Sequence, residues 1–403
     1  MKYIIVLCDG MSDRPIKSLN NQTLLQHART PNMDLLASLG RTGQLLTIPA
    51  GFDPGSEVAN ISILGYDLSD IHEGRAAFEA VGSGVELQNE DLVLRCNLIN
   101  IEGDFLNNHT AGYITTEEAE VLITYLQEHL GNDRIRFYSG KQYRHLVVVK
   151  EGDKRVECTP PHEVPLQPYY YYLPKAITVE ANHTASLIND LMSKSQKLLA
   201  DHPVNQNRIN KGKVPANAIW LWSPSHRAKI KPLSEIYPAI QKGSVISATD
   251  LIKGIGVCAG LHSIKVEGAT GLYDTDYKNK LDAALDTLVT DDFVYLHIEA
   301  CDEAGHAGDI PTKLLSMENI DKQIVGPLYE ALKSWETPVS IAILPDHSTP
   351  CEIRTHTSDP VPFLIYYPGI VPDNVQKFDE LECAKGSYGL LKGNQFMNEF
   401  LRV

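Results

Sequence analysis

Three short apolar segments, far apart along the chain, are each followed by acidic or imidazole side chains. The segments are residues 3–8, Phe293–Ile298 and Val339–Leu344. Nearly continuous apolar runs of this length are typical of strands in a parallel sheet that is covered on both faces. Ligands of such sheets bind beyond the carboxyl ends of the strands. The pattern therefore predicts an α/β fold with one metal site assembled from distant segments. The side chains that follow the strands are Asp9, then Asp302 and His306, then Asp346 and His347.

These residue types suit divalent cations. Carboxylate oxygen favours Mg²⁺ or Mn²⁺, and imidazole adds affinity for Mn²⁺, Zn²⁺ or Co²⁺. Asp302 and His306 are four residues apart, so they share one face if the segment is helical. His356, ten residues beyond Asp346, is a further candidate. Any one of these residues alone would be read as a capping or hydrogen-bonding group, so the prediction rests on the whole set.

Composition narrows the class of protein. A net charge of −15 argues against sequence-independent binding to nucleic acid or to anionic membranes, which requires a basic face. No segment approaches the roughly 18–20 apolar residues of a membrane span. The first residues do not read as a signal peptide, and the seven cysteines are scattered, so we expect reduced thiols and a cytoplasmic protein. The oligomeric state stays open, because no heptad pattern is present.

The 403 residues are too many for a single core, and the character of the chain changes along it. Both ends alternate short strands with helical patterns, and we count residues 219–222 among those strands. The middle contains the strands 92–99 and 146–149 and a helix near Thr116–Leu130. We therefore expect residues 1–80 and 215–403 to form a metal-binding α/β domain. Residues 81–214 would form a smaller inserted α+β domain.

Ser56 is a candidate nucleophile. It follows a Pro-Gly turn and precedes an apolar helical pattern, in GFDPGSEVANISILGYD. Its hydroxyl is therefore expected at a helix N-terminus, where the helix dipole favours an anion such as a phosphate. A metal ion can lower the pKa of such a hydroxyl. The alternative is that Ser56 is an ordinary N-cap. The two interpretations differ in whether Ser56 lies close to the Asp and His residues in the folded protein.

Five motifs together resemble a known family. They are DGMSDRP (residues 9–15), PGSEVANISILGYD (54–67), GRAAFEAVGSG (74–84), HIEACDEAGH (297–306) and LPDHSTPCEIRTHTSDPVPF (344–363). In this order they look like the archaeal-type, 2,3-bisphosphoglycerate-independent phosphoglycerate mutases of the alkaline phosphatase superfamily. The resemblance implies an alkaline-phosphatase-like sandwich, with a mainly parallel sheet covered by helices and an inserted substrate-binding domain.

The resemblance also implies a site and a reaction, the interconversion of 3-phosphoglycerate and 2-phosphoglycerate. Two divalent ions are implied, with Mn²⁺ or Mg²⁺ expected and Zn²⁺ or Co²⁺ also possible. Ser56 would become phosphoserine, and Asn60 would contact the phosphoryl group. One ion would be held by Asp9, Ser56, Asp346 and His347, and the other by Asp302, His306 and His356.

A small phosphorylated substrate requires cationic side chains besides the metal ions. Arg95, Arg144 and Arg227 are our candidates, because the guanidinium group binds carboxylate and phosphate in a bidentate manner. Each of the three would otherwise be read as an ordinary surface arginine. The sequence does not show which of these arginines would bind the carboxylate of the substrate and which would bind its phosphate.

Other functions fit the same scaffold. A homoserine-kinase-like phosphotransferase is one, since Ser12 replaces a glycine common in the first motif and the segment WSPSH (residues 222–226) departs from the family pattern. However, no P-loop or kinase-type glycine loop is present. A phosphatase of the superfamily is another. A sulfatase is disfavoured because residues 56–60 lack the Cys/Ser-x-Pro-x-Arg context. A catalytically silent scaffold is disfavoured because the ligand set is complete.

Overall fold

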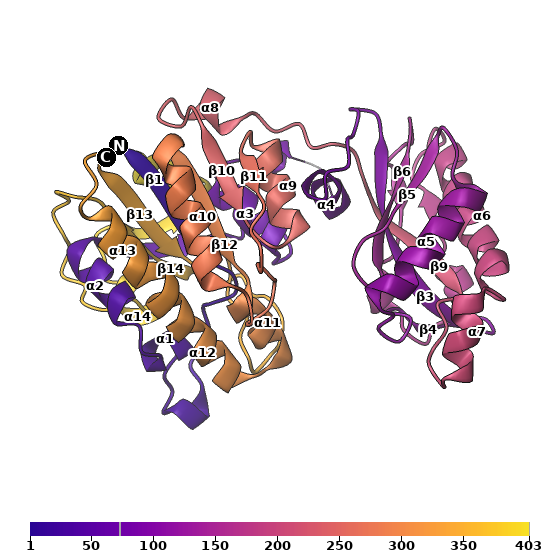
Figure 1. The fold of residues 1–403 in the computed structure, drawn as a ribbon, viewed down its shortest axis with the longest axis horizontal. Helices are drawn as coiled ribbons and strands as arrows, with labels where there is room; N and C mark the ends of the chain where they lie inside the picture. The colour runs from indigo at the N-terminus through magenta and orange to yellow at the C-terminus, as the bar shows by residue number, and fades with distance from the viewer. Residues whose placement is uncertain (72–73, 403) are drawn as a thin grey trace. The chain divides into compact units, whose positions relative to one another are not determined.

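The computed structural model describes residues 1–71 and 74–402, and the chain forms two compact units (Figure 1). The first unit comprises Met1–His72 and Lys229–Val403, and the second comprises Glu73–Ala228. The second unit thus begins earlier and ends later than the inserted domain expected over residues 81–214. The reason is that the segments at both its ends pack within it, as described below for α4 and β9.

The first unit is built on an eight-stranded sheet with the order β11-β10-β12-β1-β13-β14-β2-β15. The five neighbouring strands from β11 to β13 are parallel, whereas β14 is antiparallel to both its neighbours. The predicted α/β fold with a mainly parallel sheet is confirmed. The strands are β1 (Lys2–Cys8), β2 (Arg41–Leu46), β10 (Gly243–Ile246), β11 (His262–Ile264), β12 (Phe293–Ile298), β13 (Val339–Leu344), β14 (Val361–Tyr366) and β15 (Gly389–Lys392).

Helices pack on both faces of this sheet because successive side chains of its central strands point to opposite faces and are apolar. On β1, Ile4 and Val6 join the core that includes side chains of α2, α10, α12 and α13. Tyr3 of the same strand packs against Phe400 of α15, with ring centroids 5.6 Å apart. The helices are α1 (Leu24–His27), α2 (Pro31–Leu39), α3 (Ser56–Ile63), α8 (Leu233–Ile236), α9 (Asp250–Cys258), α10 (Tyr277–Thr290), α11 (Ala300–Ala307), α12 (Ile310–Ile320), α13 (Gly326–Leu332), α14 (Glu380–Cys383) and α15 (Phe396–Phe400).

The register of the parallel strands brings their carboxyl ends to one level. Cys8, the last residue of β1, pairs with Ile298, the last residue of β12. Leu7 pairs with Leu344, the last residue of β13. The segments that leave these three strands therefore emerge side by side at one edge of the sheet, which is where ligands bind in folds of this kind.

The second unit is an α+β structure with a five-stranded sheet. β3 pairs antiparallel with β6, β4 and β9, and β5 pairs antiparallel with β6. Helices α5 and α6 cover one face through the core that contains Leu122 and Ile188, and α4 packs on the other through Ala76 and Ala80. The main elements are α4 (Arg75–Gly82), β3 (Leu92–Glu102), β4 (Phe105–Asn108), α5 (Thr116–Leu130), β5 (Ile135–Tyr138), β6 (Arg144–Val149), β7 (Val156–Glu157), β8 (Lys175–Ala176), α6 (Asn182–Leu199), α7 (Pro203–Asn210) and β9 (Ala218–Ser225).

One strand lies in a different sheet from the one expected. Residues 219–222 form a strand, as predicted, but β9 pairs with β3 of the second unit, with Cys96 opposite Leu221. The assignment of this strand to the α/β domain was wrong. The apolar run is buried like a parallel-sheet strand, and periodicity does not specify which strand is its partner.

Two findings concern the whole described chain. None of its helices is long and apolar enough to cross a membrane. All seven cysteines are free thiols, as expected from their scattered positions.

Candidate active site

The side chains predicted as metal ligands and nucleophile come together beyond the carboxyl ends of β1, β12 and β13. Asp9 directly follows β1, and Asp346 and His347 are the second and third residues after β13. Asp302 and His306 lie one turn apart on α11, the helix that begins after β12. Contacts of 3.1–3.6 Å link Asp9, Ser56 and Asp346 to His347, and contacts of 2.9–3.4 Å link Asp302, His306 and His356 to one another. The rings of His347 and His356 stack with their centroids 4.0 Å apart, which joins the two sets into one cluster. The cluster comprises Asp9, Ser56, Asp302, His306, Asp346, His347 and His356.

His347 is at the centre of the first group. Its Nε2 lies 3.6 Å from Asp9 Oδ1, 3.5 Å from Asp346 Oδ2 and 3.1 Å from Ser56 Oγ. Ligands that each lie about 2.1 Å from one ion are about 3.0–3.5 Å from each other in octahedral or tetrahedral geometry. The spacing therefore suits a shared cation. Burial lowers the pKa of His347, which favours the neutral imidazole that a metal ligand must provide.

The second group consists of Asp302, His306 and His356. Asp302 lies 3.3 Å from His306 Nε2 and 3.4 Å from His356 Nε2, and the two imidazole nitrogens are 2.9 Å apart. Burial alone would raise the pKa of Asp302, but its contacts with the two imidazoles outweigh burial and hold this pKa well below the ordinary value. The same contact raises the pKa of His306 to about 9. The group thus offers one ionised carboxylate and two imidazoles at spacings that suit one ion.

A buried oxygen of Asp9 supports the presence of a cation. Asp9 Oδ1 is buried and has no hydrogen-bond partner within the described residues. Leaving a buried polar atom without a partner is unfavourable. Burial raises the pKa of Asp9, as do the neighbouring charges of Asp346 and Asp302. A divalent ion beside Oδ1 would satisfy this oxygen and offset the repulsion between the carboxylates, so the residues present fit such an ion.

His297 was missed by the sequence analysis, although Asp9, His297 and Asp346 are close enough to hold one ion. Its Nε2 lies 3.1 Å from Asp9 Oδ2, and its Nδ1 lies 3.1 Å from Glu299 Oε1. Carboxylates only accept hydrogen bonds, so both nitrogens of His297 face acceptors and donate. Burial opposes the charged form, but Glu299 and Asp9 raise the pKa of His297 to about 10. In the metal-free chain both nitrogens of His297 thus face carboxylates, and we expect this residue to orient Asp9. A histidine inside an apolar strand was the available signal.

Ser56 is the first residue of α3, and Asn60 lies one turn later. The Asn60 amide donates to Ser56 O at 2.8 Å and to Asp346 Oδ2 at 3.0 Å, while Asn60 Oδ1 accepts from the hydroxyl of Tyr295 at 2.6 Å. Asn60 thereby fixes the first turn of α3 to the segment after β13. Both amide hydrogens have acceptors within the protein, and a contact of Asn60 with a phosphoryl group stays a prediction.

The candidate arginines lie in the second unit. Arg95 Nε is 3.1 Å from Glu79 Oε2, and Arg75 Nε is 2.7 Å from Glu79 Oε1. The Arg95 guanidinium stacks on Trp222, 4.4 Å from the ring centroid. Burial would raise the pKa of Glu79, but Arg75, Arg95 and Arg144 together lower it. Two guanidinium groups thus pair with one carboxylate, and the charge of Arg144 also acts on it, which leaves a local excess of positive charge in a protein of net charge −15.

Arg227 occupies a different environment. Its side chain donates to the carbonyl of Leu87 at 3.4 Å and is exposed. Arg95 therefore pairs with Glu79, Arg144 lies over the ring of Tyr143 at 5.5 Å from its centroid, and Arg227 contacts a backbone carbonyl.

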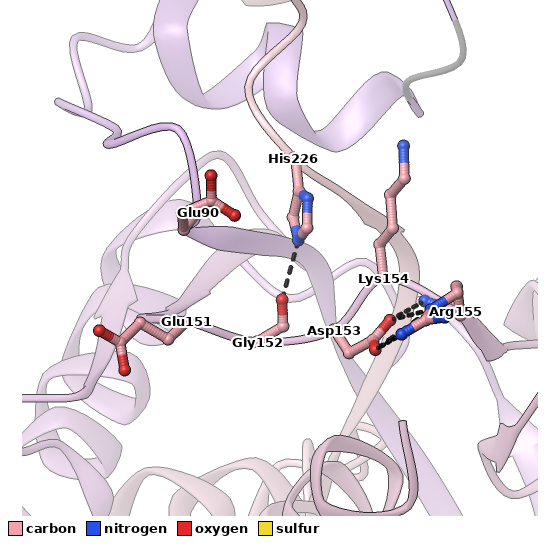
Figure 2. A pocket seen from close by; sticks show the side chains of 7 residues that line it. All are labelled: Glu90, Glu151, Gly152, Asp153, Lys154, Arg155 and His226. Atoms are coloured by element: carbon pink, nitrogen blue, oxygen red, sulfur yellow. Dashed lines mark hydrogen bonds and ion pairs between the residues drawn. The ribbon is translucent and has the colours of Figure 1, made fainter. Parts of the chain in front are cut away.

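A cavity of about 580 Å³ also lies in the second unit (Figure 2). His226 Nε2 donates to Gly152 O at 2.8 Å on one side of it, and Arg155 pairs with Asp153 on the other. None of the predicted site residues lines this cavity. Its lining residues are Glu90, Glu151, Gly152, Asp153, Lys154, Arg155 and His226.

The fold and the cluster define an α/β protein with metal-ligand groups at the carboxyl edge of a parallel sheet. A family model for 2,3-bisphosphoglycerate-independent phosphoglycerate mutase matches residues 37–205. Relatives with that name from Methanosarcina mazei and Methanosarcina barkeri are each 45% identical, over 100% of this chain and 100% of their own. The chain belongs to the 2,3-bisphosphoglycerate-independent phosphoglycerate mutase family.

Solved structures agree with this assignment. A protein from Pyrococcus horikoshii is 31% identical, with a TM-score of 0.85 over 99% of this chain and 96% of its own. A cofactor-independent phosphoglycerate mutase from Thermoplasma acidophilum is 27% identical, with a TM-score of 0.71 over 100% of this chain and 99% of its own. The family resemblance inferred from the five motifs is confirmed.

Proposed function

We propose that this protein is a cofactor-independent phosphoglycerate mutase that interconverts 3-phosphoglycerate and 2-phosphoglycerate through a phosphoserine at Ser56. The names of the Methanosarcina relatives, which match over their full length, support this reaction. The observation that carries the proposal is the position of Ser56 Oγ, 3.1 Å from His347 Nε2 within the cluster of carboxylates and imidazoles. A hydroxyl next to ligands for divalent cations is the arrangement that phosphoryl transfer requires.

Two divalent ions fit the two groups of side chains. When bound, such ions lower the pKa of a coordinated hydroxyl and neutralise charge on the phosphoryl oxygens. Mn²⁺ or Mg²⁺ suits the mixture of carboxylate and imidazole, and Zn²⁺ or Co²⁺ is chemically compatible. We assign one ion to Asp9, Ser56, Asp346 and His347, and the other to Asp302, His306 and His356.

The protein's own residues position the reacting groups. Ser56 is the nucleophile, and its place at the N-terminus of α3 directs the helix dipole toward the phosphoryl group that it accepts. Asn60 holds that turn against Asp346 through its two amide hydrogen bonds. The phosphoserine then returns its phosphoryl group to the other hydroxyl of glycerate. Water must be excluded during this time, because hydrolysis of phosphoserine would convert a mutase into a phosphatase.

We assign the substrate-binding role to the second unit. Arg75 and Arg95 pair with the single carboxylate of Glu79, and the charge of Arg144 acts on the same group, which provides the positive charge that a phosphorylated carboxylic acid needs. Arg227 is retained as a third candidate ligand besides Arg95 and Arg144.

The test is an enolase-coupled assay with purified protein, Mn²⁺ and 3-phosphoglycerate, without added 2,3-bisphosphoglycerate. We expect formation of 2-phosphoglycerate, loss of turnover in Ser56→Ala and nearly unchanged Mn²⁺ content in that variant. Ser38→Ala, which alters a half-buried serine on α2 whose hydroxyl donates to Leu35 O, is the matched control and should remain active. Turnover by Ser56→Ala would remove this residue from its role. ATP-dependent phosphorylation of homoserine without mutase activity would overturn the proposed reaction.

A further inference from the structure

One hydroxyl contacts both groups of candidate ligands. Thr349 is fully buried and lies two residues beyond His347. Its Oγ1 is 2.5 Å from Asp302 Oδ1 and 3.2 Å from His347 Nδ1. Asp302 belongs to one group and His347 to the other, so Thr349 is a common neighbour of both.

The hydrogen bonds of this hydroxyl define the state of His347. A threonine hydroxyl has one hydrogen to donate and lone pairs that accept. The carboxylate of Asp302 only accepts, so the hydroxyl hydrogen points to Asp302. The lone pairs then face His347 Nδ1, which must carry the hydrogen of the neutral ring. Nε2 keeps its lone pair, and it is Nε2 that lies 3.1 Å from Ser56 Oγ and 3.6 Å from Asp9 Oδ1.

We propose that Thr349 is a positioning residue that fixes the Nδ1–H tautomer of His347 and the orientation of Asp302, and so sets the affinity for cations in both groups. Partners that orient metal ligands in this way control metal affinity in other proteins. The inference rests on the metal-binding part of the proposed function and adds a residue to it.

The backbone of Thr349 is held from two sides. Its carbonyl accepts from Lys313 Nζ at 2.8 Å, and this fully buried ammonium also contacts Asp13 Oδ2 at 2.9 Å. On the side of α11, a Cβ atom at Gly305 would lie 2.4 Å from the Thr349 carbonyl oxygen. The absence of a side chain at Gly305 therefore lets α11, which carries Asp302, approach Thr349 closely. This close packing restricts where the Thr349 hydroxyl can point.

The tautomer can be measured on the full-length, metal-free protein by ¹⁵N NMR of labelled histidine, with His347→Gln identifying the signal. Thr349→Val removes the hydroxyl at nearly constant shape, and Thr349→Ser keeps it. We expect His347 to carry its hydrogen on Nδ1 in the wild type and in Thr349→Ser, and to lose this single tautomer in Thr349→Val. An unchanged Nδ1–H signal in Thr349→Val would overturn the proposal.

Cation affinity is the second readout, by calorimetric titration with Mn²⁺. Thr349→Val should bind in both groups about 10–100-fold more weakly, and Thr349→Ser should bind nearly as the wild type does. Thermal unfolding of the three proteins verifies that each is folded. Equal weakening in Thr349→Ser would overturn the role of the hydroxyl. A wild type that binds no Mn²⁺ would overturn the metal site itself. Absence of mutase activity with the expected titrations would overturn only the proposed reaction.

Discussion

The hydroxyl of Tyr295 donates to Asn60 Oδ1 at 2.6 Å, and this bond orients the amide that reaches Ser56 and Asp346. Tyr295 lies within β12 and is buried, and burial raises its pKa well above the ordinary value. The phenol therefore stays a donor over the working pH range. A residue in the central sheet thus determines the position of the helix turn that carries the proposed nucleophile.

Tyr295→Phe should destabilise the protein by about 1–3 kcal/mol, because Asn60 Oδ1 would be buried without a donor. Urea denaturation measures this loss, and the coupled assay should show a lower kcat because Asn60 is released. Tyr113→Phe, which alters a side chain that is 72% exposed, is the control and should change stability by less than about 0.5 kcal/mol. Equal effects of the two substitutions would argue against the role of the Tyr295–Asn60 bond.

His297 and His306 should differ when each is replaced. His297 donates to two carboxylates, so His297→Gln is expected to retain two Mn²⁺ per chain with weaker binding. His306 presents Nε2 to the second group, so His306→Ala should retain one Mn²⁺ per chain. Metal analysis after dialysis gives both stoichiometries. Loss of one ion in His297→Gln would make His297 a ligand after all.

Arg95→Met should raise KM for the phosphorylated substrate by about 10–100-fold, since charge-assisted hydrogen bonds contribute about 1.5–3 kcal/mol. Arg95→Lys should recover only part of this, because an ammonium group lacks the planar fork of arginine. Arg155→Met removes an arginine that pairs locally with Asp153 and serves as the control. A KM for Arg95→Met equal to that of the control would remove Arg95 from the substrate site.

Because of His145 in the second unit, we expect the free energy of unfolding to decrease at acid pH. Its ring is buried, which lowers its pKa from 6.5 to about 3. The unfolded chain takes up a proton below pH 6.5 while the folded chain does not. This residue's contribution to stability is therefore complete above pH 6.5 and is lost as the pH falls toward 3, at up to about 1.4 kcal/mol per pH unit.

The free energy of unfolding, measured from pH 8 to pH 4, checks this prediction. His145→Asn retains an acceptor for the backbone N–H of Gly140, which bonds His145 Nδ1 at 3.0 Å, but does not titrate in this range. We expect a shallower decline in this variant below pH 6.5. Identical slopes would show that His145 is not a source of the acid sensitivity.

The positions of the site acids could be predicted from the sequence because local rules determine them. A buried parallel strand ends at the carboxyl edge of its sheet, so Asp9 and Asp346 had to lie near each other once β1 and β13 were adjacent. The spacing of Asp302 and His306 likewise placed both on one helical face. These inferences required strand ends and helical periodicity, whereas the adjacency of β1 and β13 is a pairing that periodicity does not specify.

Other parts depend on pairings between distant segments. β9 was assigned to the wrong sheet because its apolar run fits either one, and its antiparallel partner β3 is more than a hundred residues away. His297 and Thr349 were missed for a similar reason. Their roles depend on the direction in which one buried nitrogen or hydroxyl points, and this direction cannot be derived from the sequence.

Removal of the metal ions should lower the stability of the fold, because the negative charges of the site carboxylates then repel one another. Asp9, Asp302 and Asp346 converge in a buried cluster, and the pKa of Asp9 is raised first by burial and then by the two other carboxylates. Without cations, this repulsion opposes folding. Mn²⁺ should therefore raise the melting temperature, and a chelator should lower it.

Asp9→Asn separates this electrostatic effect from general damage. The amide removes one negative charge, and its oxygen can still accept the hydrogen bond that His297 Nε2 makes to Asp9 Oδ2 at 3.1 Å. We expect the metal-free variant to melt at a higher temperature than the metal-free wild type, and Mn²⁺ to raise its melting temperature by less. A misfolded variant would melt at a lower temperature than the wild type even without metal, so it cannot produce the first of these results. Calorimetric melting curves with and without Mn²⁺ test them. A metal-free Asp9→Asn protein that melts below the metal-free wild type would show that Asp9 is not held under repulsion.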